Sequence, residues 1–185
     1  MRKLLTGIAV AGVALAISAF AFAQYVEPLA SAEQPVFTIE HDIAIAASAS
    51  EVWAVLTDFA AYPDWNPYVI FAEGELAMGE TITITIVQEN FPAPLTLHPE
   101  VARFKERRTL GWHGSVLFPG LHETDHYFEI DRLPDGRSRL HHAEEFRGWI
   151  PRLTHTEEMI APTRTAFRLM NEALAKRVEN LRGVK

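Results

Sequence analysis

The stretch Ser48–Pro67, SASEVWAVLTDFAAYPDWNP, decides the fold of this chain. Ser48 and Glu51 have the spacing of a capping box, in which two side chains bind free backbone N–H groups at the start of a helix. Two prolines in the closing segment stop helix continuation on either side of its tryptophan. The stretch therefore predicts an amphipathic helix, a short second helical turn and an aromatic–proline corner. The apolar face of the helix consists of residues at helical spacing: Val52, Val55, Leu56 and Phe59.

Residues 1–23 have the features of a secretory signal peptide. Two basic residues precede an apolar run from Leu4 to Phe22, and Ala21-Phe22-Ala23 supplies an A-x-A cleavage site. We therefore expect cleavage before Gln24 and an exported protein, either periplasmic or secreted. The alternative is an uncleaved membrane anchor, because the run is nearly long enough to span a bilayer. The small residues in the run lower its hydrophobicity and favour cleavage.

The remaining composition indicates one acidic domain. Removing 23 of the 185 residues leaves 162, with 15 basic and 24 acidic side chains and a net charge of −9. An acidic chain without a basic stripe is a poor nucleic-acid binder, so we expect no nucleic-acid partner. The absence of cysteine excludes cysteine catalysis and thiolate metal sites. Residues 24–35 lack periodicity and are predicted to form a tether before one folded domain at residues 36–185.

The folded part begins with strand patterns and ends with a helical one. Alternation is clearest at 81–88, where isoleucines alternate with threonines. A long helix is predicted from about Pro162 to Leu181, with Pro162 in its first turn and Gly183 as its C-terminal cap. The apolar stripe of this helix contains Phe167, Met170, Leu174, Val178 and Leu181. Further strands are expected at 36–46, 68–76, 95–105, 109–114, 122–132 and 139–148. This order predicts an α+β fold in which an antiparallel sheet packs on the final helix.

The chain resembles the START-like, or polyketide cyclase/dehydrase (SRPBCC), superfamily. Members open with a strand, a helix reading E-V-W-x-x-L-x-D and a Y-P-x-W-N-P corner, which match Glu51–Asp58 and Tyr62–Pro67 here. The resemblance implies a helix-grip fold: a curved antiparallel sheet wrapped around a long C-terminal helix, with an internal cavity between them. It implies a binding fold and names no reaction.

A second set of residues resembles a subgroup of that superfamily. The subgroup pattern is W, then P-G, then H-x-F-x-L, then a D-G turn, then H-x-E-x-F-x-G. The matching residues are Trp112, Pro119-Gly120, His126-Tyr-Phe128-Glu-Ile130, Asp135-Gly136 and His142-Ala-Glu144-Glu-Phe146-Arg-Gly148.

The string His122-Glu123-Thr124-Asp125-His126 is a literal H-E-x-x-H, the zinc-protease motif. In a helix the two histidines would lie ~6 Å apart and could share a zinc ion. In a strand they would lie ~13 Å apart, too far for two bonds of ~2 Å. The residues that follow alternate as in a strand, so we expect no metal site. A zinc hydrolase using His122, Glu123 and His126 is therefore only a remote alternative.

The strand interpretation places polar side chains on the inner face of a hairpin. A five-residue turn at 133–137 sets a register that pairs Ile130 with Leu140, Phe128 with His142 and His126 with Glu144. Burying His126, His142 and Glu144 among apolar residues costs several kcal/mol unless they pair or meet a polar ligand. The His126–Glu144 pair is therefore either structural or a polar anchor in a ligand cavity.

The sequence favours binding over catalysis. It has no G-x-S-x-G setting, phosphate loop or dinucleotide fingerprint, so we expect no cofactor. We expect an exported protein that holds a hydrophobic small molecule, a lipid or an aromatic compound, between sheet and C-terminal helix. The alternative is a cyclase- or dehydratase-like enzyme with His126 and Glu144 as an acid–base pair. The expected cavity residues are Trp112, His126, Phe128, His142, Glu144, Phe146, Phe167, Met170 and Leu174.

Overall fold

A computed structural model describes residues 34–154 and 156–183. The predicted signal peptide, and the predicted tether up to residue 33, lie outside the described residues, so cleavage and export stay predictions. In the described ranges, no helix combines the length and apolarity that a membrane span requires.

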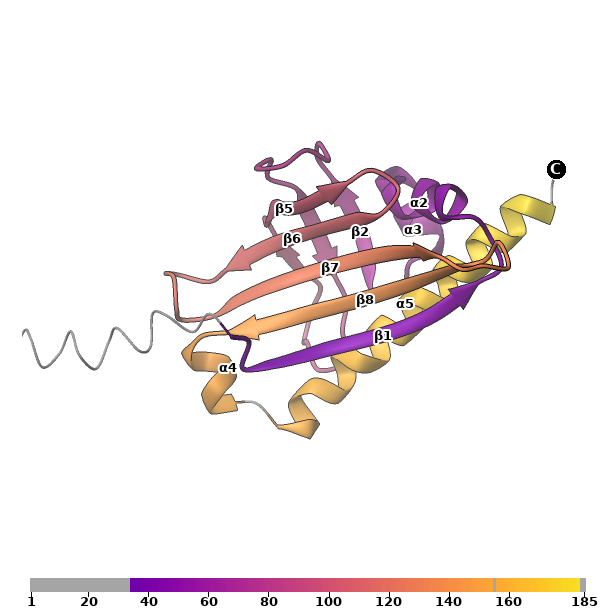
Figure 1. The fold of residues 1–185 in the computed structure, drawn as a ribbon. Coiled ribbons are helices and arrows are strands. Elements are labelled where there is room, and N and C mark those ends of the chain that lie inside the picture. Colours follow the sequence, from indigo (N-terminus) through magenta and orange to yellow (C-terminus); the bar gives the residue numbers. More distant parts are fainter. Residues whose placement is uncertain (1–33, 155, 184–185) are drawn as a thin grey trace, which may run out of the picture.

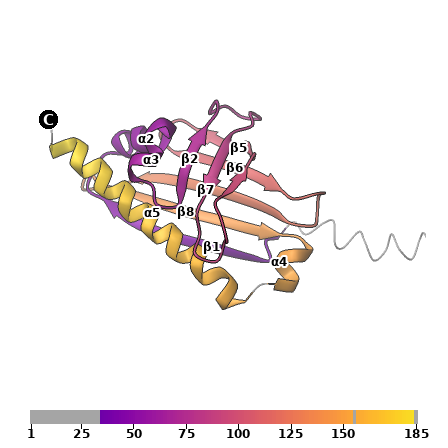
Figure 2. The ribbon, with the colours of Figure 1, turned by 180° about the vertical axis from the view of Figure 1, so that it is seen from behind.

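Two antiparallel sheets and one long helix make up the fold (Figure 1). The large sheet has the order β1 (Phe37–Ile45), β8 (Ser138–Arg147), β7 (Glu123–Arg132), β6 (Thr109–Ser115) and β5 (Glu100–Lys105). The small sheet has the order β2 (Val69–Glu73), β3 (Thr83–Ile86) and β4 (Leu95–Leu97). Helix α5 (Glu157–Gly183) runs along one face of the large sheet and packs on β1, as the view from behind shows (Figure 2). The predicted α+β helix-grip architecture is confirmed.

The turn and helices after β1 form as the opening stretch predicted. Helix α2 (Ala49–Thr57) has both halves of its capping box: Ser48 N–H donates to Glu51 over 2.8 Å, and Glu51 N–H donates to the Ser48 hydroxyl over 3.4 Å. The 3₁₀ turn η1 (Phe59–Ala61) and the short α3 (Tyr62–Trp65) follow. Asn66 Oδ1 then accepts hydrogen bonds from the backbone N–H groups of Tyr68 and Val69, which fixes the corner that starts β2.

The segment 95–105 was expected to be one strand, and this is wrong. It forms β4 and β5, which belong to different sheets, with His98 and Pro99 between them. Proline has no N–H for a ladder and breaks a strand at this point. The backbone N–H of Ile82 donates to Pro99 O over 3.0 Å, and Thr81 bridges to Glu100, so the break sits where the two sheets meet. The strand break thus divides the strands between two separate sheets.

Helix α5 starts five residues earlier than expected, so the first-turn assignment of Pro162 is also wrong. Thr156 caps it, because its carbonyl and hydroxyl oxygens both accept the backbone N–H of Met159. Pro162 lies inside the helix and removes a single N–H from its second turn. The preceding short helix α4 (Trp149–Thr154) was not predicted. The buried stripe of α5 contains Ile160, Phe167, Met170, Leu174 and Val178, whereas Leu181 is exposed.

Candidate ligand-binding cavity

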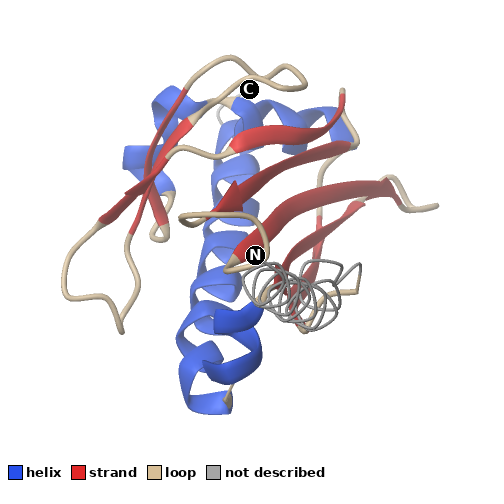
Figure 3. Cartoon of the chain, turned by 90° about the vertical axis from the view of Figure 1, so that its left-hand side faces the viewer, coloured by secondary structure: helices blue, strands red, loops and turns tan. Residues whose placement is uncertain are grey.

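A cavity of about 380 Å³ lies between the two sheets. In Figure 3 the strands of the two sheets stand on opposite sides of the long helix. The small sheet supplies an aliphatic wall, made of Val69, Ile84, Ile86, Leu95 and Leu97. The large sheet supplies a mixed wall, made of Trp112, Thr124, His126, Glu144 and Phe146. One end is bounded by Val116, His122, Ile150 and Thr163. Among the described residues that line this cavity there is no lysine or arginine, and Glu144 is the one acidic side chain.

Four of the nine residues expected in the cavity line it: Trp112, His126, Glu144 and Phe146. The other five are fully buried in the core and do not reach it: Phe128, His142, Phe167, Met170 and Leu174. The reason is the tight packing of α5 on the large sheet. The ring of Phe167 stacks on that of His142 with centroids 3.7 Å apart, which fills the space between helix and sheet at this point. The expected position of the cavity, between sheet and helix, is therefore corrected to the space between the sheets.

The predicted register of the β7–β8 hairpin is confirmed. Phe128 lies opposite His142, and His126 lies opposite Glu144. The side chains of the second pair are nevertheless not hydrogen-bonded, because His126 Nδ1 and Glu144 Oε2 are 4.0 Å apart. Trp112 on β6 stacks on the His126 ring, with centroids 4.6 Å apart and an interplanar angle of 10°. The His126 ring is thus held flat against the mixed wall.

His126 instead belongs to a chain of hydrogen bonds along the inner face of the large sheet. His126 Nε2 lies 2.9 Å from His142 Nε2, and His142 Nδ1 lies 2.9 Å from Asn171 Oδ1. The Asn171 amide nitrogen lies 2.9 Å from His41 Nδ1 and 3.2 Å from the His41 carbonyl oxygen. Asn171 was missed by the sequence reasoning, although a polar residue four positions after Phe167 interrupts the apolar stripe. His41, which lies at the far end of this series of hydrogen bonds, is half-buried.

The His41 carbonyl group determines which partner donates and which accepts in each of these hydrogen bonds. The His41 carbonyl oxygen accepts only, so the Asn171 NH₂ must face it and Asn171 Oδ1 must face His142. His142 Nδ1 therefore carries the proton that it donates to Asn171. In a neutral imidazole the other nitrogen accepts, so His126 Nε2–H donates to His142 Nε2. His126 Nδ1 is left as a free lone pair directed toward Glu144 at the cavity wall.

Burial keeps the two central rings of this hydrogen-bonded series, His126 and His142, uncharged. It lowers the pKa of His126 to about 3 and holds the pKa of His142 well below its usual range, so both rings are neutral at pH 7. Burial likewise raises the pKa of Glu144 to about 8, even though a hydrogen bond from Thr124 acts in the opposite direction. Glu144 is therefore protonated at pH 7, and its carboxyl is an O–H donor beside the His126 lone pair.

A family model described as "Polyketide cyclase / dehydrase and lipid transport" matches residues 36–179. The chain belongs to this family. The resemblance that the sequence motifs indicated is thereby confirmed at the level of the superfamily. No curated protein sequence matches the chain significantly.

Solved structures share the fold at low identity. A START superfamily protein from Mycobacterium smegmatis has a TM-score of 0.61 at 19% identity, covering 78% of this chain and 98% of that one. The Zhui aromatase/cyclase from Streptomyces sp. R1128 has a TM-score of 0.59 at 18% identity, covering 77% and 93%. A hypothetical protein from Helicobacter pylori has a TM-score of 0.63 at 14% identity, covering 77% and 88%. At these identities the likeness shows the fold alone.

The H-E-x-x-H string lies at the start of strand β7 and not in a helix. His122 precedes the strand and lines the cavity, while Glu123 accepts the backbone N–H of Gly120 over 2.9 Å. Nowhere in the described ranges do three His, Cys, Asp or Glu side chains gather closely enough to hold a metal ion. The zinc-hydrolase alternative therefore lacks the helical geometry on which it depends.

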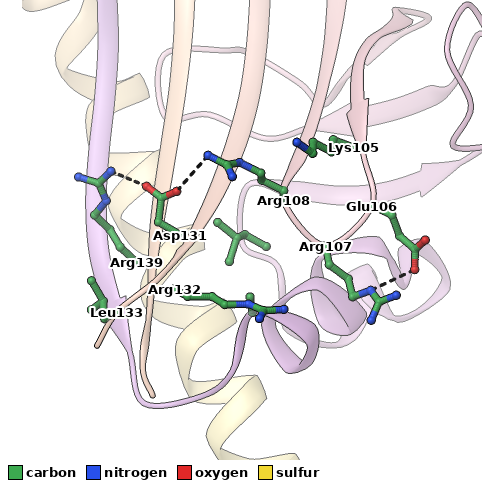
Figure 4. Close-up of a pocket in the computed structure, with 10 residues that line it drawn as sticks. Lys105, Glu106, Arg107, Arg108, Asp131, Arg132, Leu133 and Arg139 are labelled. Carbon is green, nitrogen blue, oxygen red and sulfur yellow. Dashed lines mark hydrogen bonds and ion pairs between the residues drawn. The ribbon is translucent and has the colours of Figure 1, made fainter. Parts of the chain in front are cut away.

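A second concave surface lies at the opposite end of the large sheet, between α2 and the β5–β6 turn (Figure 4). It is an open groove of about 830 Å³ with exposed, charged walls. Arg108 and Arg139 both pair with Asp131, at 3.9 and 2.6 Å, and Arg107 pairs with Glu106 at 3.2 Å. Charged side chains in open solvent bury little apolar surface, so this groove is a poor site for a hydrophobic ligand.

Proposed function

We propose that this protein binds a hydrophobic small molecule, a lipid or an aromatic compound, in the cavity between its two sheets. The observation that carries the proposal is the cavity itself: a space of about 380 Å³ with an aliphatic wall on one side and, among the polar groups of the opposite wall, the neutral side chains of His126 and Glu144. Pockets of ~300–1,000 Å³ with apolar walls and a few polar groups are typical of small-molecule sites. We further propose that binding occurs outside the cytoplasm, on the basis of the signal-peptide features of residues 1–23.

The apolar wall accounts for affinity. Burying ~200 Å² of a ligand's apolar surface would contribute about 5 kcal/mol, before the cost of association. Family membership supports the proposal, because the family description names lipid transport beside cyclases and dehydrases.

The end of the cavity near α4 offers an entrance for such a ligand. Val116 on the β6–β7 loop and Ile150 on α4 line the cavity there, and the loop carries the exposed apolar residues Leu117 and Phe118. Two backbone hydrogen bonds join α4 to this loop, from Trp149 N to Gly120 O and from Ile150 N to Leu121 O. The closeness requires a glycine before α4: at Gly148 φ is +102°, and a Cβ would lie 2.7 Å from the Gly120 carbonyl oxygen.

An acid–base enzyme is not favoured by the same geometry. His126 with a pKa of about 3 is a weak base at neutral pH. Its Nδ1 atom also lies 4.0 Å from Glu144, beyond direct proton transfer. Both groups suit hydrogen bonding to a bound molecule better than proton abstraction.

The test is the identity of what the protein carries when it is purified from its own exported fraction. Native mass spectrometry and solvent extraction should show a hydrophobic compound bound to wild type. Ile84→Trp fills the cavity from the aliphatic wall and should abolish this binding. Thr85→Trp is the matched control, because the neighbouring residue points to the opposite face of β3 and is hydrogen-bonded to Thr96 there. Equal ligand content in a folded Ile84→Trp variant and its control would contradict the proposal.

A further inference from the structure

Two hydrogen-bonding groups in the cavity wall lie within bridging distance of each other. His126 and Glu144 both line the cavity, and His126 Nδ1 and Glu144 Oε2 are separated by 4.0 Å. That separation is too long for a direct bond, yet an oxygen atom placed about 2.8 Å from each would bridge them.

The two groups differ in hydrogen-bond polarity. The chain that ends at the His41 carbonyl leaves His126 Nδ1 as an acceptor. Glu144, whose raised pKa keeps it protonated at pH 7, supplies an O–H donor. The bridging atom must therefore accept one hydrogen bond and donate another. A hydroxyl oxygen does both, whereas a carbonyl or carboxylate oxygen only accepts and an ammonium group only donates.

The charge of the lining points the same way. No lysine or arginine is found among the described lining residues, so an anionic head group would be buried without a counter-ion beside Glu144. Tyr68 also lines the cavity; burial raises the pKa of the Tyr68 hydroxyl, and Glu144 lies near enough for its carboxyl group to raise this pKa further. The polar end thus suits an uncharged, hydrogen-bonding group.

We propose that His126 and Glu144 together recognise a hydroxyl group, so that the ligand is a hydrophobic alcohol or phenol and not a fatty acid or an amine. This inference rests on the proposed function and names the ligand class for the same cavity. The hydroxyl oxygen accepts from the Glu144 carboxyl and donates to His126 Nδ1. Asn171 is a positioning residue, because it sets the direction of the chain through His142 without touching the ligand.

The experiment compares four matched two-ring probes at pH 6.5 by calorimetry and tryptophan fluorescence: naphthalene, 2-naphthol, 2-naphthoate and 2-naphthylmethylamine. We expect 2-naphthol to bind about ten-fold more tightly than naphthalene, because two hydrogen bonds are added to the same apolar contact. The anionic and cationic probes should bind more weakly than naphthalene. The tightest binding by either charged probe would overturn the inference.

Three variants test whether the preference for 2-naphthol over naphthalene depends on Glu144 in the wall of the large sheet. Glu144→Gln retains an uncharged donor and should keep the preference for 2-naphthol, whereas Glu144→Leu should bring the ratio of the two dissociation constants close to one. Glu40→Leu is the control, since Glu40 is exposed on the outer face of β1. A preference that persists in a folded Glu144→Leu variant would overturn the inference. If naphthalene and 2-naphthol bind wild type equally, the hydroxyl inference fails while the proposed function stands. If no probe binds, the proposed function fails with it.

Discussion

The two walls of the cavity are built on opposite principles. The wall from β2–β4 is aliphatic, and three of its residues, Val69, Ile84 and Ile86, are buried and carry no polar group. The wall from β6–β8 brings His126 and Glu144 into the same space, with a chain of polar groups behind them. The first wall can bind any apolar surface of suitable shape. The second can discriminate between ligands, and it does so at a cost in stability, because neutral polar groups must stay buried and satisfied.

The largest effect on stability is expected in the core behind the wall that holds His126 and Glu144, where α5 covers the large sheet. Leu174→Asp buries a carboxylate in the core and should cost more than ~3 kcal/mol. Thermal denaturation should show a melting temperature lower by about 6–12 °C or more. Leu181→Asp, on the same helix but exposed, is the control and should melt close to wild type. A Leu174→Asp variant that melts within a degree or two of wild type would show that the helix does not pack as described.

The second effect concerns the charge state of the polar wall. The pKa of Glu144 is raised from 4.5 to about 8 on folding, so the folded protein binds more protons than the unfolded chain between these values. Stability contributed by Glu144 is therefore lost as pH rises from about 4.5 through 8. Glu144→Gln removes this loss, on the order of 2–4 kcal/mol. The melting temperature of the variant, relative to wild type, should rise steadily between pH 5 and 8.5. A constant difference would place Glu144 in contact with solvent.

The third effect concerns the hydrogen bonds that run from His126 through His142 to Asn171. Asn171→Leu leaves His142 Nδ1–H buried without an acceptor, which should cost about 1–3 kcal/mol in chemical denaturation. It should also release the tautomer of His126, a change visible in the ¹⁵N chemical shifts of the imidazole. If the His126 shifts match those of wild type, the direction of the chain is set by something other than Asn171.

The smallest effect on stability belongs to the aliphatic wall. Leu95→Ala removes a partly exposed side chain and should cost less than ~1 kcal/mol. The same change removes ligand contact and should weaken 2-naphthol binding several-fold without altering its advantage over naphthalene. A change in that advantage would mean that the two walls do not act separately.

The difference between the walls also explains what the sequence could and could not predict. The inward register of His126 and Glu144 followed from alternation and from the length of one turn, both local features of 122–148. The hydrogen bonds through Asn171 could not be predicted from local sequence. They depend on where α5 lies over β8 and β1, which is a contact between distant parts of the polypeptide. The cavity was misplaced for a related reason. The apolar stripe of α5 was expected to face a ligand, whereas Phe167 packs directly on His142, and the strand break at Pro99 creates the second wall.

The position of a bound probe tests directly whether the ligand lies between the two sheets. Isoleucine δ1-methyl NMR of the protein, titrated with 2-naphthol, compares two sets of residues. Those that line the cavity are Ile84, Ile86 and Ile150, and those in the core beside α5 and the large sheet are Ile39, Ile45 and Ile130. We expect large ring-current shifts in the cavity set and small shifts in the core set. Large shifts in the core set with an unchanged cavity set would place the ligand between helix and sheet and contradict the proposed site.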